Sequence, residues 1–157
     1  MQTPSAEVID LAATIELECA ALYEVYARCF GRNEEMAQFW GLYAEAERYH
    51  HATIRIHQSS IVAGGESIGS VDVDPTEARA FLAELRQVRT EAERQPPTIA
   101  EALRRARWVE EQSAELHGRA QFFRNYPALA ELFQSMAEED RNHREVLAGA
   151  AKRWGVA

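Results

Sequence analysis

Glu47-Arg48-Tyr49-His50 and Asp140-Arg141-Asn142-His143 are two copies of one pattern, an acid placed three residues before a histidine. Residues three apart lie on one face of an α-helix, so each copy presents a carboxylate and an imidazole together. Each copy follows a further acid, Glu16 or Glu110, by about thirty residues. The repetition predicts a metal site that is built from two related halves.

The composition indicates one domain over residues 1–157. The chain has a formal net charge of −8, and its 17 Lys and Arg residues are scattered among acids, which argues against nucleic acid as a partner. No apolar run is long enough to cross a membrane and the start lacks a secretory signal pattern, so we expect a soluble cytoplasmic protein. The chain has no Cys-x-x-Cys motif, so a metal would be bound by histidine and carboxylate.

Gly and Pro residues divide the chain into long helical segments, and strand-like alternation is nearly absent. The predicted long helices span about 5–30, 34–61, 98–123 and 126–154, and a shorter one begins at Asp74-Pro75 and ends before Pro96-Pro97. Short links join the first helix to the second and the third to the fourth. The pattern predicts an all-α fold, an antiparallel four-helix bundle with a long crossover between its second and third helices that contains the extra short helix.

Apolar residues at helical spacing form a stripe along each predicted long helix. These stripes distinguish the acids that face inward from their neighbours in the sequence. Glu16 interrupts an otherwise apolar face, whereas Glu18 falls on the opposite side of the same helix. Glu110 interrupts the stripe of the third long helix, and Glu111 falls with charged residues. The acid-histidine pairs interrupt the stripes of the second and fourth helices. The predicted cluster is Glu16, Glu47, His50, Glu110, Asp140 and His143.

Four buried carboxylates without an inward Lys or Arg would be unstable as a bare cluster. Two divalent ions would neutralise them, and the two imidazoles would give one nitrogen to each ion. Oxygen-rich ligation with one nitrogen per ion suits iron or manganese better than structural zinc. We therefore expect two iron ions, with manganese, a mixed iron and manganese pair, or zinc acquired on purification as alternatives.

These residues resemble the ferritin-like superfamily, in particular rubrerythrin-like diiron carboxylate proteins, here without a rubredoxin domain. In that family two helices each give a Glu and the other two each give Glu-x-x-His. The resemblance implies that Glu47 and Asp140 bridge the metals, that Glu16 and Glu110 are terminal or chelating ligands, and that the two histidines bind one metal each.

The chain departs from the family pattern at three positions. Asp140 replaces the usual Glu and is one methylene shorter, which predicts a looser or differently selective second site. His117 shares a helical face with Glu110, so it is a seventh ligand, a hydrogen-bond partner of Asp140, or a histidine satisfied in the core. Ser113 stands where rubrerythrins place a second Glu. Tyr23 is either a packing residue, a hydrogen-bond partner of the ligands or a radical trap.

The leading functional hypothesis is Fe(II) oxidation with oxygen or hydrogen peroxide as the oxidant and an unidentified external electron donor. One alternative is a metal-binding or interaction module in which the ions are structural, and another is a metal-free helical scaffold. No sequence feature names an organic substrate. Leu17, Leu42 and Phe122 are apolar positions outside the stripes, and they predict a homodimer interface.

Overall fold

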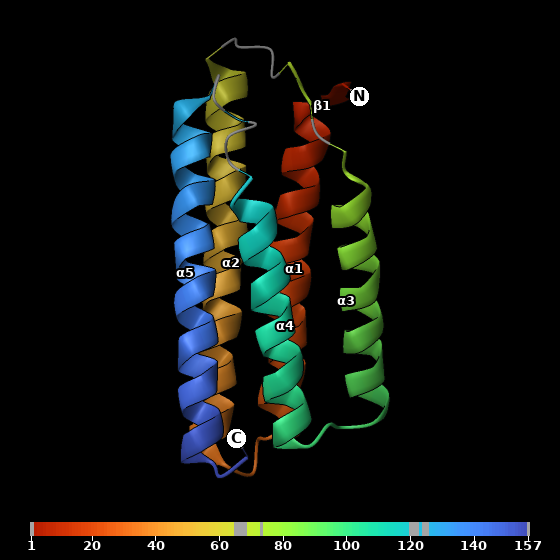
Figure 1. The fold of residues 1–157 in the computed structure, drawn as a ribbon, viewed down its shortest axis with the longest axis vertical. Helices are drawn as coiled ribbons and strands as arrows, with labels where there is room; N and C mark the ends of the chain where they lie inside the picture. The colour runs from red at the N-terminus through yellow and green to blue at the C-terminus, as the bar shows by residue number, and fades with distance from the viewer. Residues whose placement is uncertain (1, 65–68, 73, 120–122, 124–125, 157) are drawn as a thin grey trace.

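The computed structural model describes residues 2–64, 69–72, 74–119, 123 and 126–156, and it is built from helices that lie side by side (Figure 1). The all-α prediction is confirmed, apart from two strands of three residues each. In chain order the elements are β1 (Gln2–Pro4), α1 (Ser5–Cys29), α2 (Glu34–Ala63), β2 (Ser70–Asp72), α3 (Thr76–Arg94), α4 (Ile99–His117) and α5 (Pro127–Arg153).

The helix starts follow from local hydrogen bonding. The side chain of Asn33 accepts a hydrogen bond from the backbone N–H of Met36 at 3.1 Å and caps α2. Thr98 and Glu101 form a capping box at the start of α4. Pro127 stands in the first turn of α5, where its missing N–H has no helical partner to lose.

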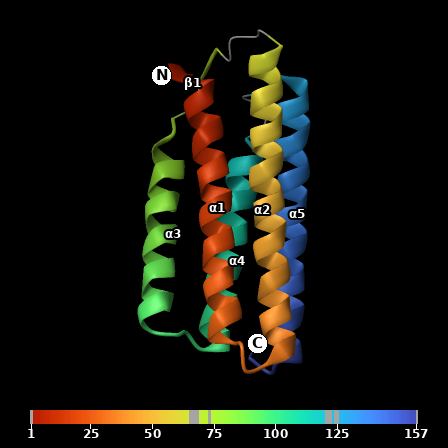
Figure 2. The same ribbon diagram turned by 180° about the vertical axis from the view of Figure 1, so that it is seen from behind.

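Two antiparallel helix pairs form the body of the molecule. Helix α1 packs against α2, and α4 packs against α5. In Figure 1, α1 and α5 run downward while α2 and α4 run upward. Helix α3 lies on the outer side of α1, as the view from behind also shows (Figure 2). Arg86 and Arg89 of α3 form ion pairs with Glu18 of α1 and fix this contact.

Three details differ from the sequence prediction. Helix α3 lies within the expected bounds and is shorter than α1, α2 and α5, but with 19 residues it is as long as α4. Helix α4 ends at His117 instead of near residue 123; the backbone N–H of Gly118 still bonds the carbonyl of Ala114 at 2.9 Å, and the N–H of Arg119 bonds the carbonyl of Leu116 at 3.2 Å in a tighter last turn. Strands β1 and β2 pair antiparallel and tie the start of the chain to the segment before α3. Phe122, one of the predicted interface positions, lies outside the described residues.

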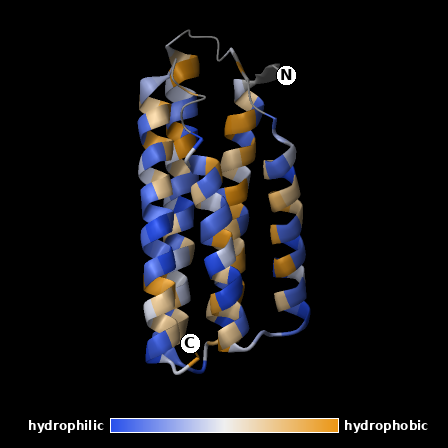
Figure 3. Cartoon of the chain, in the orientation of Figure 1, coloured by the Kyte–Doolittle hydropathy of each residue, from blue (hydrophilic) through white to orange (hydrophobic). Residues whose placement is uncertain are grey.

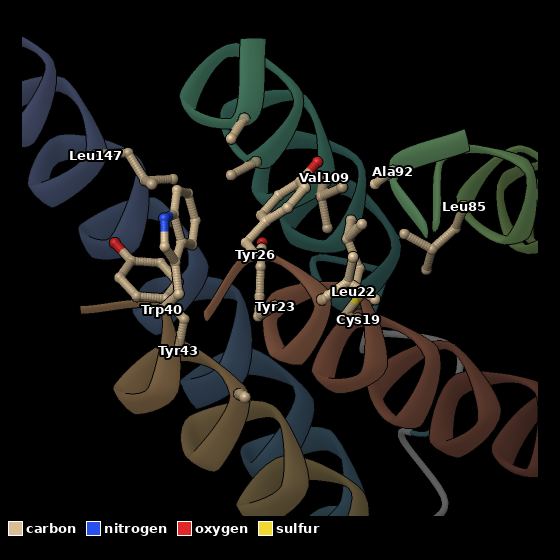
Figure 4. Close-up of a cluster of buried hydrophobic side chains, with 14 of the residues drawn as sticks. Cys19, Leu22, Tyr23, Tyr26, Trp40, Tyr43, Leu85, Ala92, Val109 and Leu147 are labelled. Carbon is tan, nitrogen blue, oxygen red and sulfur yellow. The ribbon is translucent and has the colours of Figure 1, made fainter. Parts of the chain in front are cut away.

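The buried apolar side chains form two clusters. The larger includes Trp40 and Tyr43 of α2, which pack against Tyr23 and Tyr26 of α1 (Figure 4). The smaller lies toward the other ends of these helices and includes Ile54. Figure 3 shows that α1 is richest in hydrophobic residues, in keeping with its position between α2 and α3. No helix in the described part of the chain combines the length and apolar character that a bilayer crossing requires.

Candidate metal centre

Four acids converge in a layer between the two apolar clusters, one from each of α1, α2, α4 and α5. Their exposed fractions are close to zero, at 0% for Glu16, 3% for Glu47, 1% for Glu110 and 0% for Asp140. Their neighbours face elsewhere. Glu18 pairs with the arginines of α3, and Glu111 pairs with Arg144 at 3.5 Å. The helical stripes therefore identified which acid of each close pair is buried.

The first group of atoms that could hold a metal ion comes from Glu16, Glu47 and His50. Nδ1 of His50 lies 3.1 Å from Oε2 of Glu16 and 3.2 Å from Oε2 of Glu47. One ligand atom from each of the three residues lies within 4.8 Å of the others. An ion placed among them would have two carboxylates and one imidazole nitrogen.

The second group consists of Glu47, Glu110 and His143, and one ligand atom from each of these residues also lies within 4.8 Å of the others. Nδ1 of His143 lies 3.1 Å from Oε2 of Glu110 and 3.8 Å from Oε1 of Glu47. The rings of His50 and His143 are stacked, with their centroids 6.5 Å apart. Glu47 belongs to both groups, with one carboxylate oxygen toward each, which is the geometry of a carboxylate shared by two ions.

Asp140, the sixth predicted ligand, belongs to neither group, although it is fully buried. Its Oδ2 lies 2.7 Å from Nδ1 of His117, while Nε2 of the same ring lies 3.2 Å from Oε1 of Glu16. His117 thus joins the two acids, as the hydrogen-bond alternative for this residue predicts. Oδ1 of Asp140 has no hydrogen-bond donor among the described residues, and Oε1 of Glu16 has an ion-pair contact with His117 but accepts no hydrogen bond of good geometry there. Such buried carboxylate oxygens are suited to a cation.

Three further side chains hold the predicted ligands. The hydroxyl of Tyr23 donates a hydrogen bond to Oε1 of Glu110 at 2.5 Å, as one of its sequence alternatives expected. Tyr43 donates to the backbone carbonyl of His143 at 2.9 Å. Sequence reasoning missed Glu139, whose Oε2 lies 2.9 Å from Nε2 of His50. A carboxylate on the outer nitrogen of a ligating histidine orients the ring and increases its basicity.

Protons compensate the charge of the cluster when no cation is bound. Burial raises the pKa of Glu47, Glu110 and Asp140. Burial acts the same way on Glu16, but contact with His117 outweighs it and lowers the pKa of this acid. Although burial opposes a charged imidazole, the carboxylates raise the pKa of His50 to about 12 and that of His117 to about 10. The metal-free cluster therefore holds protons that a metal ion would displace.

No family model, curated protein sequence or solved structure matches the chain. The chemistry of the site is therefore argued from its own geometry. Each of the two groups of three ligand atoms could hold a metal ion, Glu47 is common to both, and Asp140 adds a buried oxygen without a donor among the described residues.

Proposed function

We propose that this chain binds two iron ions in the buried layer and promotes the oxidation of Fe(II). The observation that carries the proposal is the position of Glu47 in both ligand groups, which lets one carboxylate serve two ions. Glu16 and His50 would complete the first site, and Glu110 and His143 the second. Asp140 would offer its free oxygen to the pair while His117 holds the other oxygen.

The ligand set favours iron or manganese over zinc. Each ion would be bound mainly by carboxylate oxygens with one imidazole nitrogen, whereas structural zinc sites are closed and tetrahedral and are rich in cysteine or histidine. Manganese, a mixed pair, or zinc taken up on purification remain the alternatives. Two bound Fe(II) ions supply one electron each, which matches an oxidant that takes two, such as dioxygen or hydrogen peroxide.

The residues around the ligands serve this chemistry by fixing geometry and excluding water. Tyr23 and Glu139 hold Glu110 and His50 from outside the ligand groups, so the side chains are oriented before an ion binds. The apolar clusters on both sides limit the access of bulk water to the layer, although the partly exposed side chains of Glu139 and His143 reach solvent at its edge. A dry surrounding strengthens the attraction between the carboxylates and a metal ion whose charge rises on oxidation.

The same ligand pattern supports a ferritin-like architecture. Helices α1, α2, α4 and α5 would be the four bundle helices, and the connection that contains α3 would be the long crossover. Leu17 and Leu42, exposed by 49% and 66%, are available for a homodimer interface. We place the protein in the cytoplasm, without nucleic acid or membrane partners, and it would need an external electron donor to turn over.

Anaerobic addition of Fe(II) to metal-free protein followed by mixing with air tests the proposal. We expect binding of two iron ions per chain and oxidation faster than in buffer. His50→Ala and His143→Ala should each abolish the acceleration, whereas His57→Ala, on the same helix as His50 but outside both groups, should not. Unaccelerated oxidation by the native chain would rule out the redox function.

The second candidate is a purely structural metal site. The contact between Asp140 and His117 favours it, because this acid is already engaged and is less free to change its binding when the metal changes charge. In that case metal would raise the melting temperature while Fe(II) would oxidise no faster than in buffer.

A further inference from the structure

A small apolar pocket lies beside the carboxylate layer, where α1 and the end of α4 meet the starts of α3 and α5. Its volume is about 60 Å³, and its walls include Leu11, Ala12, Ile15, Ala78, Leu116 and Phe133. A single water needs roughly 10–15 Å³ of such space, so the pocket has room for a few molecules of that size. It is too small for a bulky organic substrate.

One side chain connects this pocket to the predicted ligands. His117 forms part of the pocket wall and is almost fully buried. Its two ring nitrogens contact Asp140 at 2.7 Å and Glu16 at 3.2 Å. At the outer end of the pocket lie the exposed residue Asp74 and the half-exposed residue Arg119. The pocket therefore extends from the protein surface to a histidine in direct contact with two buried acids.

The chemistry of the walls selects the kind of molecule that can reside there. Between Asp74 and Arg119 at its outer end and His117 at its inner end, the pocket is lined by aliphatic and aromatic side chains that offer water and hydrogen peroxide few hydrogen bonds. A polar molecule that loses its hydrogen bonds in this apolar part is disfavoured. Dioxygen has no hydrogen-bond donors to satisfy and is small enough for the space. Its transfer from water into an apolar environment is favourable.

We propose that the pocket is an entry chamber for dioxygen, and that dioxygen is the oxidant at this site in preference to hydrogen peroxide. The inference rests on the proposed iron oxidation. In the balanced reaction, two Fe(II) ions lose one electron each, and dioxygen takes up these two electrons and two protons from solvent to give hydrogen peroxide. His117 marks the inner limit of the chamber.

Xenon, an apolar gas, reports the chamber independently of activity. Crystals of the native chain under xenon pressure should show an anomalous peak between Ala78, Leu116 and His117. Ala78→Phe should remove the peak by filling the space, and the smaller Ala78→Leu should weaken it. Ala83→Phe is the matched control, since Ala83 is an exposed alanine of the same helix that lies outside the pocket. Absence of xenon from the native pocket would overturn the inference.

The kinetic experiment compares two oxidants on the same Fe(II)-loaded proteins. Ala78→Phe should slow oxidation by dissolved dioxygen several-fold while leaving oxidation by added hydrogen peroxide unchanged, and Ala83→Phe should leave both rates unchanged. An undiminished rate with dioxygen, or equal slowing with both oxidants, would overturn the inference. If the native chain itself fails to accelerate oxidation, the proposed function fails. If the native chain is active and Ala78→Phe is equally fast with dioxygen, the chamber alone is rejected.

Discussion

Glu47→Gln gives the sharpest test of the two-ion centre, because Glu47 belongs to both ligand groups. The substitution replaces the carboxylate that we propose to be shared by both ions with a neutral amide, and it should weaken both sites. Glu16→Gln and Glu110→Gln each alter one group and should weaken one site. The three variants make the same chemical change in the same buried layer, and the shared-ligand reasoning predicts that they differ in how many ions they affect.

The expected effect is large enough to measure by thermal unfolding. A ligand present at 100 times its dissociation constant stabilises the folded state by about 2.7 kcal/mol, so two sites contribute about 5 kcal/mol. For a chain of this size, 1 kcal/mol shifts the melting temperature by about 2–4 °C, which gives about 10–20 °C for two ions. We expect roughly half of that shift for Glu16→Gln and Glu110→Gln, and the smallest shift for Glu47→Gln.

The assay uses a redox-inert ion such as Zn(II), with calorimetry or circular dichroism to follow unfolding. Each variant is compared with its own metal-free form. Burial raises the pKa of Glu47, which favours a protonated carboxyl in the metal-free protein. A protonated carboxyl resembles the amide of Gln, so Glu47→Gln should change the melting temperature of the metal-free protein little. Glu45→Gln, which alters an exposed acid of the same helix, is the control. The shared-ligand reasoning is refuted if Glu47→Gln retains the native shift or behaves like Glu16→Gln.

Three further predictions concern the surroundings of the ligands. Metal binding should release protons, because carboxylate contacts outweigh burial and raise the pKa of His50 to about 12. The apparent affinity for Zn(II) should therefore rise between about pH 6 and pH 8. Calorimetry in different buffers measures the protons released, and an affinity that does not change with pH would contradict the prediction. Tyr23→Phe removes the donor to Glu110 and should cost the metal-free protein about 1–3 kcal/mol in urea unfolding, so unchanged stability would be inconsistent with a formed hydrogen bond. His117→Ala leaves Asp140 buried without its partner and should destabilise the metal-free protein by about 3–5 kcal/mol. The metal-loaded protein should lose less stability, because the cation would compensate the charge of Asp140. An equal loss of stability in both forms would show that the cation does not compensate this acid.

The burial of the cluster was predictable because helical geometry is local. A carboxylate within an apolar stripe turns inward with that stripe, and this distinguished Glu16 from Glu18 without knowledge of the neighbouring helices. The same reasoning identified His50 and Asp140 as buried. Whether these residues bind metal remains a prediction.

Other features depend on contacts between different segments of the chain, which the apolar stripe of a single helix does not predict. Glu139 lies on the outer face of its helix, and only the position of α2 shows that its side chain reaches His50. The sequence did not determine the hydrogen-bond partner of Asp140. His117 belongs to another helix, and the rotation of that helix about its axis decides whether the two side chains meet. The pairing of β1 with β2 joins segments far apart in the sequence, and neither segment has enough alternation to predict it. Gly118 directly follows α4, but its φ of −60° is helical and Gly41 and Gly149 lie within helices, so a glycine alone did not predict this end.

The charged layer divides the apolar interior into two parts, and this division bears on the lifetime of the protein. Apolar contacts hold each end of the helices together, but the middle is held by ionic contacts whose strength depends on protons or bound metal. Small changes in stability alter the fraction of unfolded chains, and proteases act on that fraction. If the proposed iron centre forms, the chain would be degraded faster when iron is scarce, so its abundance in the cell would follow the iron supply.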